Sequence, residues 1–427
     1  MIEKLESVYV AFWCVVMPIT SFLIVPSIQG TVPAYILGFV SLVFVLIKFK
    51  TDGLNEKNQK YLYLLLSVGF AWLLLMVGSQ LGNIIDGRRD FPGASLINDL
   101  DEKIVFRSAL FTQSLYLGAC VLIFLYFRLY FRSEWMKYVF WGAYLMAAYG
   151  VYEWVYYLIF KQPGDFIANR MYGEDHPGSW SQTMEVGGLS LLRIKSFYGE
   201  PSFYSSAIIL YLMAAINANR FWLICLLIFN GLFSTSTTCY IGLGVCLLFH
   251  SILSPKGRAL GICLLVLMIG AVVTISCLVP DTFNGMFTDK ISGANESGEM
   301  RIQANYDTMQ LLGGFSPMNW LFGIGFGYAY NQVDTAVLTN TGVIGVIIFW
   351  WAFLKPVVCL PREGIAGAYK TAIFGVFFLF NLTLSELFLP TTWMFLGLAY
   401  KALDEYRKPH EGEDRELSGE LISAPEQ

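Results

Sequence analysis

Apolar runs long enough to cross a membrane recur along almost the whole chain, and no other feature constrains its fold so strongly. A helix that spans the hydrocarbon core needs about 20 predominantly apolar residues. Because backbone groups inside a bilayer must be satisfied internally, the runs predict an all-α, polytopic membrane protein. We expect twelve membrane helices, at 7–27, 31–48, 61–83, 109–127, 138–160, 201–216, 221–234, 238–253, 259–279, 335–354, 367–387 and 391–402.

The composition agrees with a chain that is solvated mainly by lipid. Of its 427 residues, 56% are hydrophobic and 14% are charged, whereas soluble domains carry about 25% charged residues. The formal net charge of −4 is small and dispersed, which argues against a nucleic-acid partner. The eight cysteines lie in or beside apolar runs without a CxxC spacing. We therefore expect buried free thiols.

The distribution of lysine and arginine orients the predicted helices. With a cytoplasmic N-terminus, the even number of crossings returns the C-terminus to the cytoplasm. The cytoplasmic loops then carry Lys and Arg near helix ends, whereas the short outer connections 28–30, 235–237 and 388–390 carry none, as the positive-inside rule requires. We expect residues 1–402 to form one membrane-embedded domain, and the acidic, Pro-containing tail 403–427 to be disordered in the cytoplasm.

Three outer segments are long, and they are the expected location of function. They are 84–108, 161–200 and 280–334. A membrane scaffold does not need long loops, so their presence on one face is typical of a functional surface. Their Lys and Arg residues also break the charge bias of the outer side, which indicates a role for these cations.

The second outer loop enters a membrane helix through residues 193–204, with the sequence RIKSFYGEPSFY. Pro201 suits a first helical turn, and a helix N-terminus presents free N–H groups to an anion. We expect Arg193 to grip a phosphate, Lys195 to add a point charge, and Glu200 to accept a proton from a sugar hydroxyl. The structural alternative is that Glu200 complements the helix dipole while both cations contact lipid headgroups.

The third outer loop carries a second candidate set. Arg301 is followed by Asn305 and Tyr306, and then by the sequence GIGFG at 323–327. Glycines permit close backbone approach, but no strand precedes them, so a nucleotide-binding fold is not implied. Arg301 is the stronger candidate for a substrate contact, with a lipid headgroup contact as the alternative.

Two acidic residues lie within the predicted membrane helices. Glu153 and Glu386 are costly there unless they are paired or near an interface, and both fall toward the outer ends of their helices. Each either lines a cavity or reaches outer water. His176 stands beside Glu174 and Asp175, which is a poor metal site by ligand count. We expect no metal and no cofactor.

In this order, the motifs resemble those of the Wzy-type O-antigen polymerases and of the superfamily that joins them to the O-antigen ligases. The resemblance rests on 193–204, on the Ser/Thr-rich hinge 233–243, on Arg301, and on 323–327 leading to 341–345. It covers roughly the second half of the chain, whereas the first half matches only as a run of membrane helices.

The resemblance implies an integral glycosyltransferase of the bacterial inner membrane, with a GT-C-like fold and an active site facing the periplasm. Such an enzyme moves the growing glycan from undecaprenyl pyrophosphate onto the next lipid-linked oligosaccharide, and a chain-length-regulating co-polymerase of the Wzz type is its implied partner. We accordingly expect Glu200, Arg301 and Arg193 to be catalytic. The expected substrate and pyrophosphate contacts are Lys195, Tyr198, Tyr204, Asn305, Tyr306 and Gly325.

Two departures from the family pattern bear on the alternatives. The hinge often carries an Arg where this chain has residues 236–238, and ligases tend to show a His-Asn pair where it has Val333-Asp334. The second departure favours a polymerase over a ligase, which would transfer the glycan to a lipid A core sugar. A flippase or transporter of lipid-linked oligosaccharides is the alternative from another class, because twelve spans suit a transporter. Broken helices in related halves would indicate it.

Overall fold

The chain is a mostly helical membrane protein. The computed structural model describes residues 2–26, 28–170, 182–186, 189–253, 258–278, 280–288, 292, 294 and 296–422. Four of the described helices are long and apolar enough to cross a membrane, namely α2 (Pro33–Asp52), α3 (Glu56–Ile85), α4 (Ser108–Leu129) and α14 (Val333–Cys359).

Further helices lie in the remaining predicted segments. They are α1 (Ile2–Val16), α5 (Met136–Phe160), α6 (Pro201–Asn217), α7 (Phe221–Phe233), α8 (Thr237–Leu253), α9 (Arg258–Leu278), α15 (Gly364–Phe380) and α16 (Pro390–Ile422). A short 3-10 turn, η1 (Ser133–Trp135), precedes α5. A helix therefore lies in each of the twelve predicted segments, although several bounds differ from the prediction.

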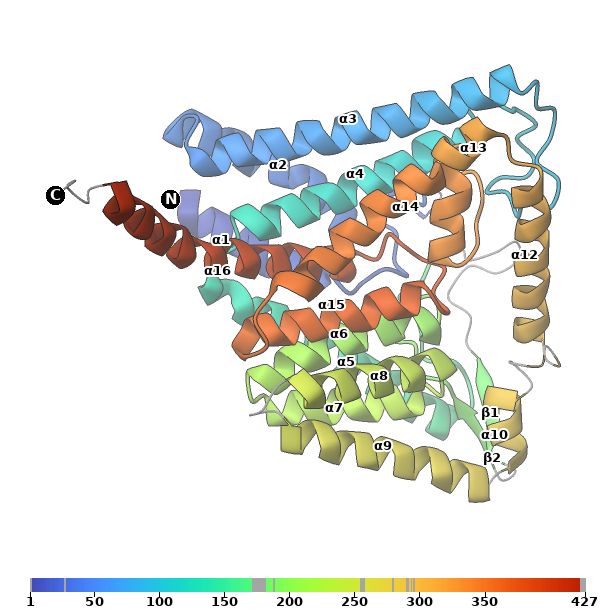
Figure 1. Ribbon diagram of the computed structural model, residues 1–427. Helices are drawn as coiled ribbons and strands as arrows, with labels where there is room; N and C mark the ends of the chain where they lie inside the picture. The colour runs from blue at the N-terminus through green and yellow to red at the C-terminus, as the bar shows by residue number, and fades with distance from the viewer. Residues whose placement is uncertain are drawn as a thin grey trace.

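Most of the long helices run side by side (Figure 1). Both chain ends lie at one end of this bundle, which we call the terminal end, and α12 (Glu296–Gly313) lies across the opposite end, which we call the α12 end. Helix α6 is central, because nearly all of its residues are buried and it packs on α7, α8 and α15. Its first residue, Pro201, is at the α12 end.

The long loops contain the remaining elements. Loop 280–334 forms α10 (Pro280–Phe283), the π-helix η2 (Asn284–Thr288), α12 and α13 (Pro317–Phe322). Loop 161–200 forms the antiparallel hairpin of β1 (Thr183–Val186) and β2 (Leu189–Leu192), in which Thr183 pairs with Leu192. Loop 84–108 has no strand of its own, but Leu96 forms an isolated bridge with Ala329. Loops 84–108 and 280–334 therefore meet at the α12 end.

Local sequence explains several helix starts. Asn55 caps α3, because its side chain accepts a hydrogen bond from the backbone N–H of Asn58. Ser316 caps α13 in the same way, through the N–H of Asn319. Such caps satisfy N–H groups that have no partner inside a helix. Pro201 begins α6, where a missing N–H costs nothing.

The predicted helix at 7–27 is wrong in its second half. Helix α1 ends at Val16, and residues 18–26 are not helical. Pro18 lacks the N–H that an α-helix needs at that position. The chain instead makes tertiary hydrogen bonds, because the backbone N–H groups of Thr20 and Ser21 donate to the carbonyl of Phe197 at 3.1 and 2.9 Å.

Two other bounds differ from the prediction. The helix expected at 367–387 ends at Phe380, and residues 381–389 form an irregular segment. Helix α16 extends past residue 403 as far as Ile422, and the disorder expected for the tail 403–427 stays a prediction. Its glutamates, arginines and leucines are good helix formers, so the acidic composition does not prevent the helix from continuing.

Candidate functional site

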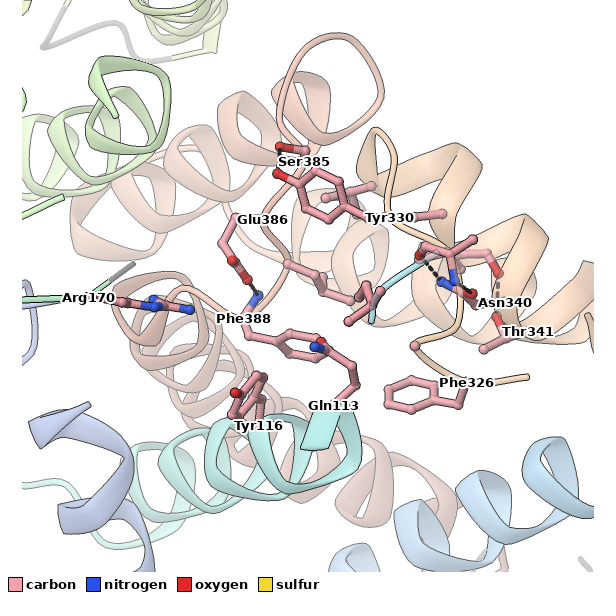
Figure 2. A pocket seen from close by; sticks show the side chains of 17 residues that line it. Gln113, Tyr116, Arg170, Phe326, Tyr330, Asn340, Thr341, Ser385, Glu386 and Phe388 are labelled. Carbon is pink, nitrogen blue, oxygen red and sulfur yellow. Dashed lines mark hydrogen bonds between the residues drawn. The ribbon is translucent and has the colours of Figure 1, made fainter. Parts of the chain in front are cut away.

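A cavity of about 140 Å³ lies at the α12 end, where α4, the start of α14 and the segment 385–388 meet (Figure 2). Its surface is mainly apolar, but several polar side chains reach it, and we call it the polar cavity after them. Its side chains come from parts of the chain that are far apart in sequence. This convergence of polar groups in a concave site is typical of ligand pockets. The polar lining residues are Gln113, Arg170, Tyr330, Asn340, Thr341, Ser385 and Glu386.

A second cavity, of about 210 Å³, adjoins the polar one and is lined almost wholly by apolar side chains of α3, α4, α14 and α16. The two cavities share Phe326, Val337, Thr341 and Leu387. On α14 the apolar wall extends from Val337 to Phe353, which is roughly 24 Å of helix. The polar cavity at the α12 end therefore adjoins an apolar groove that follows the helices toward the terminal end.

Arg170 supplies positive charge to the polar cavity. Its residue is 9% exposed, its Nε donates to Oε1 of Gln29 at 3.2 Å, and its Nη1 donates to the Thr20 carbonyl at 3.3 Å. The backbone N–H of Arg170 also donates to the carbonyl of Ser21. The irregular segment after α1 thus holds this guanidinium in place, which explains why α1 stops early.

Glu386 supplies the facing carboxylate. Its Oε1 accepts a hydrogen bond from the backbone N–H of Phe388 at 2.9 Å, which fixes the side chain at the cavity wall (Figure 2). Both Glu386 and Arg170 interact electrostatically with Tyr116 and with Tyr330. The cavity therefore presents a cation and a carboxylate in a partly buried setting, where charges interact more strongly than in water.

The wall formed by α14 is interrupted at Gly342, whose φ of 65° is not helical. A Cβ at this glycine would lie 2.4 Å from the carbonyl carbon of Leu321 in α13, so only glycine permits this close approach. The break exposes carbonyl groups of α14. Those of Thr339 and Asn340 accept hydrogen bonds from the N–H groups of Ile324 and Gly325, at 2.9 and 3.3 Å.

Asn340 secures the loop that follows the glycines. Its Nδ2 donates to the carbonyl of Ala329 at 2.8 Å, and its Oδ1 accepts from the N–H of Ala329 at 2.7 Å. The hydroxyl of Tyr328 in the same loop donates to Gln80 at 2.8 Å. The role of Asn340 is therefore to shape the cavity, because its side-chain amide already forms hydrogen bonds with the backbone of Ala329.

Glu200, the expected catalytic residue, is not among the residues that line this cavity. It occupies the position before α6, and its Oε2 accepts a hydrogen bond from Ser202 at 2.8 Å. It interacts electrostatically with Tyr330 on the cavity wall and with Arg193. Its catalytic role stays a prediction.

Arg193 binds the hinge between α7 and α8. Its Nε donates to Oγ1 of Thr235 at 3.1 Å, its Nη2 donates to the Thr235 carbonyl at 3.2 Å, and its Nη1 donates to Gln182. Burial lowers the pKa of its guanidinium to about 10, and the nearby Glu200 carboxylate opposes this change. Arg193 is therefore a cation at neutral pH, and much of its donor capacity is used inside the protein.

Lys195 does not line the polar cavity. It is 1% exposed and forms ion pairs with Glu153, at 3.3 Å, and with Asp165. The hydroxyl of Tyr149 donates to the same Asp165 carboxylate at 3.0 Å. A buried lysine between two carboxylates is a structural element, because those partners compensate the cost of burying its charge. For Glu153 the sequence suggests either a cavity lining or contact with outer water. In the structure it is buried in this cluster with Lys195.

Three other residues that we expect to contact the substrate instead make contacts inside the protein. The hydroxyl of Tyr198 is within 3.1 Å of Oγ1 of Thr391, and the hydroxyl of Tyr204 donates to Asn230 at 3.0 Å, both in the buried interior. Gly325 has a φ of 144°, and a Cβ there would meet the ring of Tyr328. These residues shape the α12 end and its supporting core.

The residues expected on the third loop lie on α12. Asn305 and Tyr306 are exposed on this helix, and neither lines the polar cavity. Arg301 is also part of α12, but its side chain lies outside the described part of the structure. His176 falls in the segment 171–181, which is outside the described residues as well.

The sequence reasoning missed Arg170, Tyr330, Ser385 and Gln113 as members of one site. Arg170 lies in the long loop 161–200, where an outer cation breaks the charge bias, and this signal could have singled it out. Tyr330, Ser385 and Gln113 carry no comparable signal, because isolated Tyr, Ser and Gln residues are common near membrane interfaces. Within the described ranges, no three His, Cys, Asp or Glu side chains are placed to hold a metal ion.

Comparison with known proteins leaves the family open. No protein family, curated protein or solved structure matches the chain.

Proposed function

We propose that this protein is a membrane glycosyltransferase that polymerises oligosaccharide repeat units carried on undecaprenyl pyrophosphate. The observation that carries the proposal is that the polar cavity and the apolar groove lie side by side and share four lining residues. A lipid-linked sugar needs a polar site for its pyrophosphate and glycan beside an apolar path for its prenyl chain, and the shared wall at Phe326, Val337, Thr341 and Leu387 fits both requirements.

The proposed topology has twelve crossings in the bacterial inner membrane, with a GT-C-like arrangement by resemblance. Both termini lie at one end of the bundle, as an even number of crossings requires, and we assign that end to the cytoplasm from the excess of Lys and Arg near its helix ends. The α12 end, with the polar cavity, then faces the periplasm. A chain-length-regulating co-polymerase remains the proposed protein partner.

The proposed reaction uses the charges at the polar cavity. The acceptor hydroxyl attacks the anomeric carbon of the donor glycan, a glycosidic bond forms, and the bond from that carbon to the pyrophosphate oxygen breaks. A carboxylate takes the hydroxyl proton, and we assign this step to Glu386, which lines the cavity, with Glu200 as the neighbouring candidate. Undecaprenyl pyrophosphate departs as an anion, which Arg170 stabilises.

Reconstitution with purified lipid-linked repeat units tests the proposal. The wild-type protein in nanodiscs, given these units and no other acceptor, should make a ladder of polymers. Glu386→Gln should lower the polymerisation rate at least about 100-fold, as expected for loss of a general base, and Arg170→Ala should have a comparable effect. A wild-type protein that makes no ladder overturns the proposal, and a ladder that needs added lipid A core identifies a ligase.

Matched control variants at the same end of the bundle separate loss of a catalytic group from a general effect of removing a charge. Glu102 and Arg89 are exposed on loop 84–108 and do not line the polar cavity. Glu102→Gln and Arg89→Ala should therefore leave the polymerisation rate within about twofold of wild type, since exposed charges are screened and contribute little. If they reduce the rate as strongly as Glu386→Gln and Arg170→Ala, the assignment of the cavity is wrong.

One observation favours a transporter of lipid-linked oligosaccharides as the second candidate. Helix α14 is broken at Gly342 beside the cavity, and discontinuous helices line the binding sites of many transporters. Here the freed carbonyls of Thr339 and Asn340 are already occupied by the glycine-rich loop, which favours the polymerase. Cells that lack a transporter would accumulate lipid-linked units on the inner leaflet, whereas cells that lack a polymerase would accumulate single capped units.

A further inference from the structure

Tyr330 presents an aromatic ring to the polar cavity. The residue is 47% exposed although it lines a concave site. Its hydroxyl lies 2.7 Å from Oγ of Ser385, so the polar end of the side chain has a partner inside the protein. Figure 2 shows the ring on the cavity wall with its hydroxyl beside Ser385.

The backbone around this ring is held from several directions. The N–H of Tyr330 donates to the carbonyl of Ser95 at 2.8 Å. The preceding Ala329 exchanges two hydrogen bonds with Asn340, and the side chain of Asn331 donates to Oγ1 of Thr308 on α12 at 2.6 Å. A ring that is fixed before binding loses little conformational entropy when a ligand packs on it.

A tyrosine of the membrane-interface belt has a different setting. Such a residue directs its hydroxyl to water or headgroups and its ring to lipid. Tyr330 instead bonds its hydroxyl to Ser385 and places its ring beside Glu386 and across from Gln113, on the inner wall of the cavity (Figure 2). Tyr306 on α12 is 60% exposed and does not line the cavity, so it provides a comparison.

The groups around the ring match the chemistry of a neutral sugar. A pyranose has an apolar face of C–H groups and a rim of hydroxyls. The ring face of Tyr330 offers an apolar, polarisable surface, while the Glu386 carboxylate and the Gln113 amide offer hydrogen-bonding partners for hydroxyls. Near the ring, the charge of Arg170 offsets one of the two carboxylates, Glu386 and Glu200, and leaves an excess of negative charge. This excess disfavours an anionic sugar relative to a neutral one.

We propose that Tyr330 is the platform of a sugar-binding subsite at the polar cavity, with its ring packed on the apolar face of a neutral pyranose and with Glu386 and Gln113 bonded to the hydroxyl rim. Ser385 positions the ring through the hydroxyl bond. This subsite extends the proposed function, and its ligand class rests on that function. It specifies that the sugar unit bound next to the reacting centre is neutral.

Saturation-transfer NMR tests the subsite without requiring polymerisation. The protein is placed in lipid nanodiscs, because common detergents carry sugars themselves, and is given a panel of neutral methyl glycosides and one methyl uronoside. Wild type should transfer saturation to the C–H protons of at least one neutral glycoside and not to the uronoside. Tyr330→Phe should retain the signal, and Tyr330→Ala should weaken binding about tenfold. Tyr152→Ala should match wild type, because Tyr152 on α5 is 42% exposed and does not line the cavity.

The outcomes distinguish this inference from the proposed function. Absence of neutral glycoside binding to wild type, or equal binding by Tyr330→Ala, overturns the subsite even if the protein makes polymer. Stronger transfer to the uronoside than to every neutral glycoside overturns the assigned ligand class. Neutral glycoside binding that depends on Tyr330, in a protein that makes no ladder from lipid-linked units, supports the subsite and refutes the polymerase.

Discussion

Removal of the Lys195 side-chain charge is the sharpest test of how the α12 end is built. In the folded protein Lys195 lies between Glu153 and Asp165 and is 1% exposed. Lys195→Met keeps most of the side-chain volume but leaves two buried carboxylates without their cation. Breaking a buried ion pair in this way costs about 3–5 kcal/mol, because the remaining charge is uncompensated.

The expected shift in melting temperature follows from the chain length. With an unfolding entropy of about 2 cal/mol/K per residue, a chain of 427 residues loses about 1 °C for each ~0.9 kcal/mol of stability. Lys195→Met should therefore melt roughly 4 °C below wild type. The triple variant with Glu153→Gln and Asp165→Asn should recover at least about half of this loss, since no buried carboxylate then lacks a cation.

The cysteines supply the assay. Cys14, Cys120, Cys239 and Cys246 are buried free thiols, so a thiol-reactive dye reports unfolding as they become accessible on heating. Exposed thiols react before heating and set the baseline. The matched control is Lys103→Met, because Lys103 is exposed on loop 84–108 and its removal should change the melting temperature by less than about 1 °C.

An unchanged melting temperature would refute this reasoning. If Lys195→Met melts with wild type and yet loses polymerisation, Lys195 contacts the substrate, as the sequence first led us to expect. If the triple variant melts below the single one, the three residues stabilise the fold through packing or hydrogen bonds, and the compensation of buried charge is not the main term.

Three further predictions concern the cavity and its supports. Gly342→Ala should destabilise the protein by about 2–4 kcal/mol in the same dye assay, because its Cβ would overlap the backbone of α13, whereas Gly118→Ala, which meets nothing within 4 Å, should be neutral or stabilising. Asn340→Ala should leave a buried backbone pair unsatisfied and speed hydrogen exchange in the glycine-rich loop; unchanged exchange would contradict its anchoring role. Hydrogen bonds from Ser108 lower the pKa of Asp101. The Asp101 carboxylate therefore stabilises the folded protein above the ordinary carboxyl pKa, and this stabilisation is lost as the pH falls through the pKa of Asp101 in the folded protein. Asp101→Asn should accordingly speed exchange at the start of α4 at neutral pH, and equal exchange would exclude that effect.

Helix positions were predictable because they depend on properties within one segment. A run of apolar side chains favours a helix in lipid wherever it is packed, and Pro201 marks the start of α6 from its own covalent geometry. The early end of α1 was not predicted, although Pro18 lies beside it, because the non-helical segment is stabilised by hydrogen bonds to Phe197, far away in the chain. The break in α14 at Gly342 likewise depends on a close approach to α13.

The sequence by itself determined that the chain is a helical membrane protein and that cations and carboxylates gather in its long loops. Only the tertiary structure decided which of these charges meet a cavity. Lys195 is bound by Glu153, 42 residues earlier, and does not reach the cavity. Arg193 is likewise bound at the hinge by Thr235. Arg170 and Glu386, in contrast, line the polar cavity. The physical reason is that the surroundings of a buried charge depend on the partners that compensate its burial, and those partners come from other parts of the chain.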